Sequence, residues 1–140
     1  MIEQISVFAE NKKGQLSEVI DLITSKGIDI RGLMVADGTD FGVIRMVVTD
    51  TQTSLEILAE KGYKAYSMGV LCFSIRDKIG SLNKVMQLIE RSGINVEYCY
   101  SLLGKDAKTA EIVVKTREVE EAEQILARNE ITLVTPETLV

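Results

Sequence analysis

The chain has 140 residues, of which 46% are apolar and 26% charged, and its formal net charge is −5. This composition is typical of a folded globular protein, and the negative charge argues against a nucleic-acid partner because phosphate binding needs a basic surface. Histidine is absent, which excludes histidine-based nucleophile pairs, histidine general bases and imidazole zinc ligands.

The first half of the chain predicts the element order β-α-β-β-α-β. Residues 2–8 alternate like a half-buried strand, with Ile5 and Val7 on one face and Gln4 and Ser6 on the other. A helical pattern follows over residues 15–26 and ends at a glycine suited to a left-handed C-cap. The remaining predicted elements are a strand at 28–36, a turn at 37–40, a strand at 41–49, a helix at 53–61 and a strand at 64–68.

The second half repeats the first. Gly80 lies 66 positions after Gly14, Gly93 lies 66 positions after Gly27, and at the same offset residues 46–48 fall on residues 112–114. A repeat of this size indicates one domain built twice, which predicts domains at 1–69 and 70–140 with no flexible linker between them. The second set of predicted elements is a strand at 70–75, a helix at 81–92, a strand at 95–103, a turn at 104–106, a strand at 108–115, a helix at 118–128 and a strand at 131–135.

The sequence has no pattern typical of a membrane span, a signal peptide, a disulfide framework or a cysteine metal site. No apolar run approaches the roughly 18 residues of a membrane span, and no signal-peptide pattern opens the chain. We therefore expect a cytoplasmic protein with no membrane partner. Cys72 and Cys99 lie in apolar strand-like runs and form neither a disulfide framework nor a metal motif. We expect no metal, no other cofactor and no catalytic residue.

The loop between the first strand and first helix of each half carries the most information about function. It reads ENKKGQL at residues 10–16 and RDKIGSL at residues 76–82. A glycine at the start of a helix leaves backbone N–H groups unobstructed, and these groups with the helix dipole favour a carboxylate. Asn11 and Asp77 are able to accept hydrogen bonds from an ammonium group. The loops therefore suit an α-amino acid, with the alternative that Gly14 and Gly80 only permit a tight turn.

Both copies of the pattern Asn/Asp-x-x-Gly-x-Leu-x-x-Val, followed by Gly-Ile-Asn/Asp-Ile/Val and a hairpin, resemble the ACT domain, and the resemblance covers residues 1–140. It implies a small regulatory protein that binds amino acids. It also implies an α+β fold of two ferredoxin-like βαββαβ units, each with strand order 4-1-3-2. We expect the units to lie side by side and share one eight-stranded antiparallel sheet with the helices on one face.

Side-by-side pairing through the second strands would bring the start of each second strand near the glycine loop of the other unit, so that each ligand touches both repeats. The two sites are expected to be unequal, because residues 11–13 are cationic whereas residues 77–79 are balanced and partly apolar. The predicted ligand-binding residues are Asn11, Lys12, Gly14, Gln15, Leu16, Asp29, Ile30, Asp77, Ile79, Gly80, Ser81, Leu82, Asn95 and Val96.

The functional hypothesis is a regulatory or sensor protein for a small-molecule amino acid, acting on a metabolic enzyme or through a homodimer. One alternative is a regulatory subunit of an amino-acid biosynthetic enzyme, such as the acetolactate synthase regulatory subunit, although here the second half repeats the first. Alternatives of another class are a small enzyme that uses carboxylates in the cleft, and a structural assembly module without a ligand. An RNA-recognition module shares the element order, but the chain lacks the basic face and stacking aromatics that such a module needs.

Overall fold

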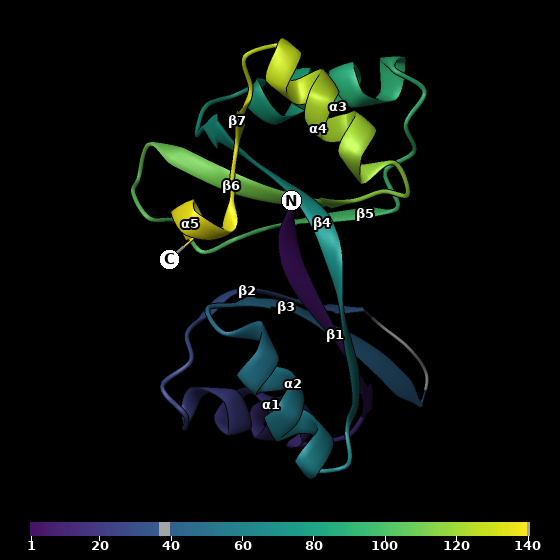
Figure 1. The fold of residues 1–140 in the computed structure, drawn as a ribbon, viewed down its shortest axis with the longest axis vertical. Coiled ribbons are helices and arrows are strands. Elements are labelled where there is room, and N and C mark those ends of the chain that lie inside the picture. The colour runs from purple at the N-terminus through teal and green to yellow at the C-terminus, as the bar shows by residue number, and fades with distance from the viewer. Residues whose placement is uncertain (37–39, 140) are drawn as a thin grey trace. The chain divides into compact units, whose positions relative to one another are not determined.

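The computed structural model describes residues 1–36 and 40–139, so most of the turn predicted at 37–40 lies outside the described residues. The chain divides into two compact units, Glu3–Met68 (the first unit) and Gly69–Val140 with Met1–Ile2 (the second unit), each a sheet covered by helices (Figure 1). The elements are, in order, β1(Ile2–Glu10), α1(Gln15–Thr24), β2(Ile30–Ala36), β3(Phe41–Val48), α2(Thr51–Glu60), β4(Lys64–Arg76), α3(Ser81–Arg91), β5(Tyr98–Ser101), β6(Thr109–Lys115), α4(Val119–Arg128), β7(Thr132–Leu133) and α5(Pro136–Leu139).

The sheet of the first unit has the strand order β2-β3-β1-β4, which confirms the predicted order 4-1-3-2. β1 and β2 both pair antiparallel with β3, so they run parallel to each other. Their C-terminal ends therefore lie at the same end of the sheet. This arrangement places the loop after β1 beside the end of β2. The start of β2, where Asp29 and Ile30 lie, is therefore at the opposite end of the sheet from the glycine loop of this unit.

The second unit has the same topology. β4 pairs antiparallel with β6 and β7, and β6 pairs antiparallel with β5, which gives the order β7-β4-β6-β5. The strand predicted at 95–103 is shorter in the structure, since β5 covers only Tyr98–Ser101. The last strand is also short, and a helical turn that the sequence pattern did not predict, α5, follows it.

The described residues form seven strands, where the sequence predicted eight. The two strands predicted at 64–68 and 70–75 are one continuous strand, β4, whose first part belongs to the first unit and whose second part belongs to the second. Gly69, the predicted boundary, lies inside this strand. An added Cβ there would be 2.2 Å from the Met1 sulfur, so the flexible Met1 side chain would have to move to admit a larger residue.

Strand register corrects the repeat alignment in the second hairpin. Ile5 faces Met46, and Leu71, which lies 66 positions after Ile5, faces Val114. Met46 therefore corresponds to Val114 and not to Ile112, an offset of 68. The hairpin turn of the second unit is two residues longer than that of the first, and a shift of two leaves every side chain on the same face of the strand. For this reason the apolar residues of the two strands match at an offset of 66 as well as at 68.

Each unit has its own apolar core between the sheet and its two helices, which cover one face (Figure 1). In the first unit Ile5 and Val7 of β1 pack with Val19 and Ile23 of α1, and none of these four is accessible to solvent. In the second unit the corresponding residues of β4 and α3 are Leu71, Phe73, Val85 and Ile89. The helical and strand periodicities of the sequence are satisfied by this packing.

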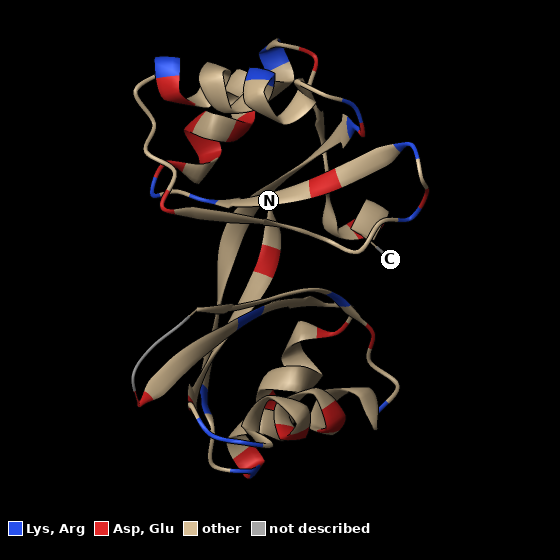
Figure 2. Cartoon of the chain, turned by 180° about the vertical axis from the view of Figure 1, so that it is seen from behind, with Lys and Arg blue, Asp and Glu red and all other residues tan. Residues whose placement is uncertain are grey.

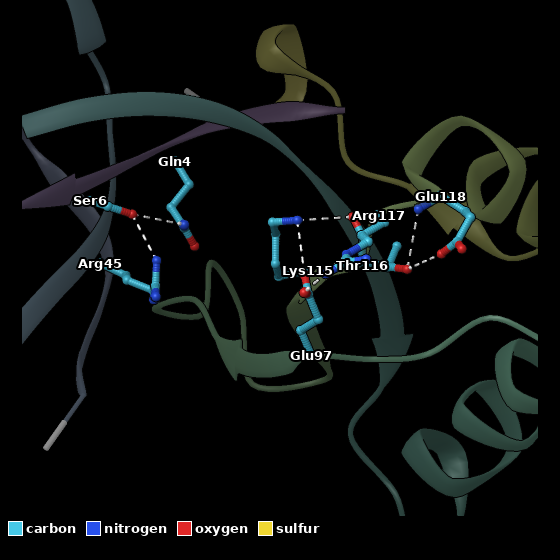
Figure 3. A network of polar contacts seen from close by, with 8 residues as sticks. All are labelled: Gln4, Ser6, Arg45, Glu97, Lys115, Thr116, Arg117 and Glu118. Carbon is cyan, nitrogen blue, oxygen red and sulfur yellow. Dashed lines mark hydrogen bonds and ion pairs between the residues drawn. The ribbon is translucent and has the colours of Figure 1, made fainter.

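The opposite face of β1 is more buried than predicted. Gln4 and Ser6 were expected on the polar side of a half-buried strand, but both are 0% exposed. Their polar groups are satisfied, because Arg45 Nη1 donates to Ser6 Oγ at 2.9 Å and Gln4 Nε2 donates to the same oxygen at 3.5 Å (Figure 3). Hydrogen bonding makes this burial of polar side chains tolerable.

Charged side chains lie mainly on helix surfaces and in loops (Figure 2). In the second unit Lys115 Nζ donates to Glu97 Oε2 at 3.0 Å, and Thr116 Oγ1 donates to Glu118 Oε2 at 3.0 Å (Figure 3). None of the helices in the described part of the chain is long and apolar enough to cross a bilayer.

Candidate functional site

The loop after β1 is held by backbone hydrogen bonds. Asn11 N donates to Asp40 O at 2.8 Å, Lys12 N donates to Glu10 O at 3.0 Å, and Gln15 N donates to Lys12 O at 3.3 Å. Gly14 precedes α1 in the left-handed conformation, with φ 86° and ψ −9°, and no side chain caps the helix. An uncapped helix start leaves first-turn N–H groups available to water or an anion.

The loop after β4 has the same geometry. Asp77 N donates to Lys108 O at 2.8 Å, and Ser81 N donates to Lys78 O at 3.2 Å. Gly80 has φ 90° and ψ −12°, again without a side-chain cap on the following helix. Both predicted glycine loops are therefore present as left-handed turns at the start of a helix, with similar glycine dihedral angles and the same backbone hydrogen bonds.

The first unit has a pocket beside its glycine loop, which we call the loop pocket. It holds about 410 Å³ of empty space, part of it open to solvent. Apolar residues from the ends of β1, β2 and β3 and from the start of α1 line most of it, namely Ala9, Leu16, Val35, Ala36, Gly42 and Ile44. Its polar residues are Glu10, Asn11, Lys12 and Gln15. Four of the predicted binding residues, Asn11, Lys12, Gln15 and Leu16, are thus brought together here.

The charges of the loop pocket are paired. Lys12 Nζ lies 2.9 Å from Glu10 Oε2, and the side-chain hydrogen bond from Lys12 to Glu10, assisted by the charge of Glu10, raises the pKa of Lys12 above its ordinary value of 10.5. Lys12 and Lys13 were predicted to make residues 11–13 cationic, and Glu10 offsets the charge of Lys12. The described lining of the pocket therefore combines one paired set of opposite charges with apolar surface.

Tyr63 links α1 to the connection between α2 and β4. Its hydroxyl donates to Glu18 Oε1 at 2.9 Å and accepts a hydrogen bond from Gln15 Nε2. Partial burial raises the pKa of Tyr63, and the hydrogen bond to Glu18 raises it further. These contacts fix the orientation of Gln15 at the rim of the loop pocket. They also border a second, polar hollow that includes Gly14 and Lys13.

The predicted residues of the second loop are placed differently. Ser81 lines an open hollow between the start of α3 and the connection from α4 to β7, together with Arg76, Lys78 and Lys84. Ile79 is fully exposed, and Leu82 is 40% exposed. Asp77, Ile79, Gly80 and Leu82 do not line that hollow. The residues that surround the two loops therefore differ, and the inequality of two ligand sites stays a prediction.

The residues predicted at the starts of the second strands lie away from the glycine loop of their own unit. Asp29 pairs with Arg31, whose Nη1 is 3.2 Å from Asp29 Oδ2, and the Asp29 side chain is 63% exposed. Ile30 begins β2, whereas Asn95 and Val96 precede β5. The expectation that these four residues contact a ligand at the loop of the other unit stays a prediction.

Sequence patterns missed several lining residues of the loop pocket. Val35 and Ala36 end β2, and Gly42 and Ile44 lie near the start of β3. A signal for Val35 was present, because parallel first and second strands bring the end of the second strand to the loop. Nothing in local sequence marks Gly42 or Ala9, since their importance depends on their pairing with each other across β1 and β3.

The remaining chemistry is sparse. Cys72 is buried. Burial is the main cause that raises the pKa of its thiol to about 12, and the nearby charge of Glu111 is a smaller one, so the thiol is unreactive at neutral pH. No cluster of three or more His, Cys, Asp or Glu side chains within the described residues is arranged to hold a metal ion.

Two ferredoxin-like units in tandem, each with a left-handed glycine between its first strand and first helix, define a class of paired α+β domains. The family model described as an ACT domain pair matches residues 1–140. The chain belongs to the ACT domain pair family, as the sequence resemblance predicted. No curated protein sequence matches the chain.

Solved structures share this architecture. Protein BT0572 from Bacteroides thetaiotaomicron is 26% identical with a TM-score of 0.91, over 99% of this chain and 94% of that one. The ligand-free regulatory subunit of aspartate kinase from Thermus thermophilus is 16% identical with a TM-score of 0.66, over 90% of both chains. The same subunit from Thermus flavus is 19% identical with a TM-score of 0.61, again over 90% of both. At these identities the two Thermus proteins establish the fold alone.

Proposed function

We propose that this protein is an amino-acid-binding regulatory protein without catalytic activity of its own. The loop pocket is the observation that carries this proposal, because it places an uncapped helix start, the polar side chain of Asn11 and an apolar cavity next to one another. An α-amino acid presents a carboxylate, an ammonium group and a side chain that match these three features.

The binding mode follows from the loop geometry. The ligand carboxylate is directed at the first-turn N–H groups of α1, where the helix dipole stabilises negative charge. The Asn11 side chain accepts a hydrogen bond from the ligand ammonium group. The ligand side chain enters the apolar part of the pocket beneath Leu16. Gln15, held by Tyr63, borders the opening.

Regulation requires that the ligand bind one conformation of the protein more tightly than another. A ligand can shift a conformational equilibrium only by its differential affinity for the two states. We infer that amino-acid binding changes the surface presented to a partner, either an enzyme of amino-acid metabolism or a second copy of this chain. The regulatory subunits of aspartate kinase among the similar structures support such a role.

The test is a thermal-shift screen of refolded, ligand-stripped protein against the common amino acids, followed by calorimetry of any hit. The protein contains no tryptophan, so the screen uses an added dye. A ligand at about 100 times its dissociation constant stabilises the folded state by roughly 2.7 kcal/mol, which raises the midpoint by several degrees at roughly 2–4 °C per kcal/mol. A shift confined to a few amino acids supports the proposal. No shift and no heat with any amino acid would refute it.

A further inference from the structure

Two small residues face each other in the lining of the loop pocket. Ala9 of β1 and Gly42 of β3 are directly paired, and both line the pocket. In the second unit the equivalent pair is Ile75 and Ala110, as the register of β4 and β6 shows. Each of these residues is larger than its counterpart, and both pack against the core of their unit. The two units therefore differ in side-chain size at this strand pair.

Among the described residues, the apolar part of the loop pocket presents no charged side chain to a ligand. Leu16, Val35 and Ile44 supply apolar surface. At the rim, Glu10 and Lys12 neutralise each other at 2.9 Å. A charged ligand side chain would lose its hydration here without gaining an ionic partner, which is unfavourable. An aliphatic side chain gains by leaving water.

We propose that the loop pocket is a specificity pocket for α-amino acids with a neutral aliphatic side chain, and that the chain has one such site. In the second unit the equivalent paired positions hold the larger residues Ile75 and Ala110, which leaves less room there. This inference rests on the proposed function and deepens it, since it names the class of ligand and the number of sites. Both units have a glycine loop, so the loops alone do not explain why one unit would bind the ligand. The paired residues next to each loop differ in size and do explain it.

A series of amino acids with increasingly long side chains measures how long a side chain the pocket accepts. Calorimetry of the 140-residue protein compares L-alanine, L-2-aminobutyrate, L-norvaline and L-norleucine, with L-aspartate and L-lysine as charged controls. We expect affinity to rise about fourfold for each added methylene until the pocket is full, the equivalent of about 0.8 kcal/mol. We expect one site per chain and at least tenfold weaker binding of the charged amino acids.

Matched variants in the two units locate the site. Val35 is 49% exposed, and its equivalent by register is Ser101, which is also exposed. Val35→Lys places a charge at the pocket wall and should weaken norvaline binding at least tenfold, while Ser101→Lys leaves it unchanged. Leu16→Ala should weaken binding several-fold, while Leu82→Ala does not. All four positions are exposed, so the thermal midpoints of the variants should stay near that of the wild type.

Ala9→Val tests the small-residue floor. The added methyl groups shorten the pocket, so the gain in affinity should stop at a shorter ligand of the series than in the wild type. If this variant does not fold, the exposed-position variants decide the question.

The failures are distinguishable from one another. A flat affinity series, two equivalent sites per chain, tighter binding of a charged amino acid, or unchanged norvaline binding in both Val35→Lys and Leu16→Ala would overturn the specificity pocket but leave an amino-acid-binding protein. An absence of binding by every amino acid would overturn both the pocket and the proposed function.

Discussion

The glycine before α1 offers a direct test of how the loop conformation contributes to stability. Gly14 has φ 86°, and a Cβ added there would have no neighbour within 4 Å. Replacement by alanine therefore changes only the backbone energetics. The left-handed conformation costs an L-residue about 1–2 kcal/mol, and alanine regains about 0.4–1 kcal/mol by restricting the unfolded chain. We expect Gly14→Ala to lower the free energy of unfolding by about 1 kcal/mol.

The assay is urea denaturation followed by circular dichroism, with the thermal midpoint as a second measure. A loss of about 1 kcal/mol lowers the midpoint by roughly 2–4 °C in a chain of this size. Gly14→Asn is the matched control, because asparagine tolerates the left-handed region and should retain more stability than alanine. Gly80→Ala should lose as much stability as Gly14→Ala, since Gly80 has φ 90° and an equally open surrounding.

Ligand binding then separates the two glycines. Relief of the strained left-handed backbone in Gly14→Ala would displace the first-turn N–H groups of α1 and should weaken amino-acid binding, whereas Gly80→Ala should leave it unchanged. Wild-type stability in Gly14→Ala would refute the backbone argument. Equal binding losses in the two variants would refute the location of the site in the first unit.

Three further predictions concern other parts of the chain. Glu130 occupies a left-handed position with φ 60°, so Glu130→Gly should raise the free energy of unfolding by about 0.5–1 kcal/mol in urea denaturation, and a decrease would contradict this. At pH 8 a thiol reagent should label exposed Cys99 in the native protein but Cys72, with a pKa of about 12, only after unfolding; rapid labelling of both would show that Cys72 is not buried. Asp50 is the N-cap of α2, and hydrogen bonds from the side chain and backbone N–H of Thr53 lower its pKa below the ordinary value of 3.8. Its carboxylate therefore stabilises the fold above pH 3.8. This contribution is lost as the pH falls through the lowered pKa. Asp50→Ala should therefore reduce the thermal midpoint at pH 7 and converge on the wild type in acid, and a constant difference across this pH range would refute the assignment.

Several features of the fold were predictable because they depend on residues close together in the chain. The alternation around Ile5 and the helical spacing of Val19 and Ile23 identify one strand and one helix, and both elements are present. Gly14 and Gly80 adopt the left-handed turns that their position before a helix implies. The start of α2 was predicted two residues late, because the N-cap at Asp50 was not recognised.

Features that depend on cross-strand neighbours were not predictable in this way. The offset of 68 between β3 and β6 follows from pairing with β1 and β4, because a shift of two residues preserves the apolar alternation and leaves no trace in the pattern. The continuity of β4 through Gly69 replaced two predicted strands with one.

The sequence alone determined the repeated βαββαβ order, the strand order through its resemblance to a known family, and the two glycine loops, since periodicity and turn chemistry are local properties. Only the tertiary structure decided which residues line the pocket beside the first glycine loop. Ala9 and Gly42 are 33 positions apart in the chain and become neighbours only when β1 and β3 pair, and the same pairing brings Ile75 against Ala110 in the second unit. The space beside each loop is therefore set by side chains that only the folded sheet brings together.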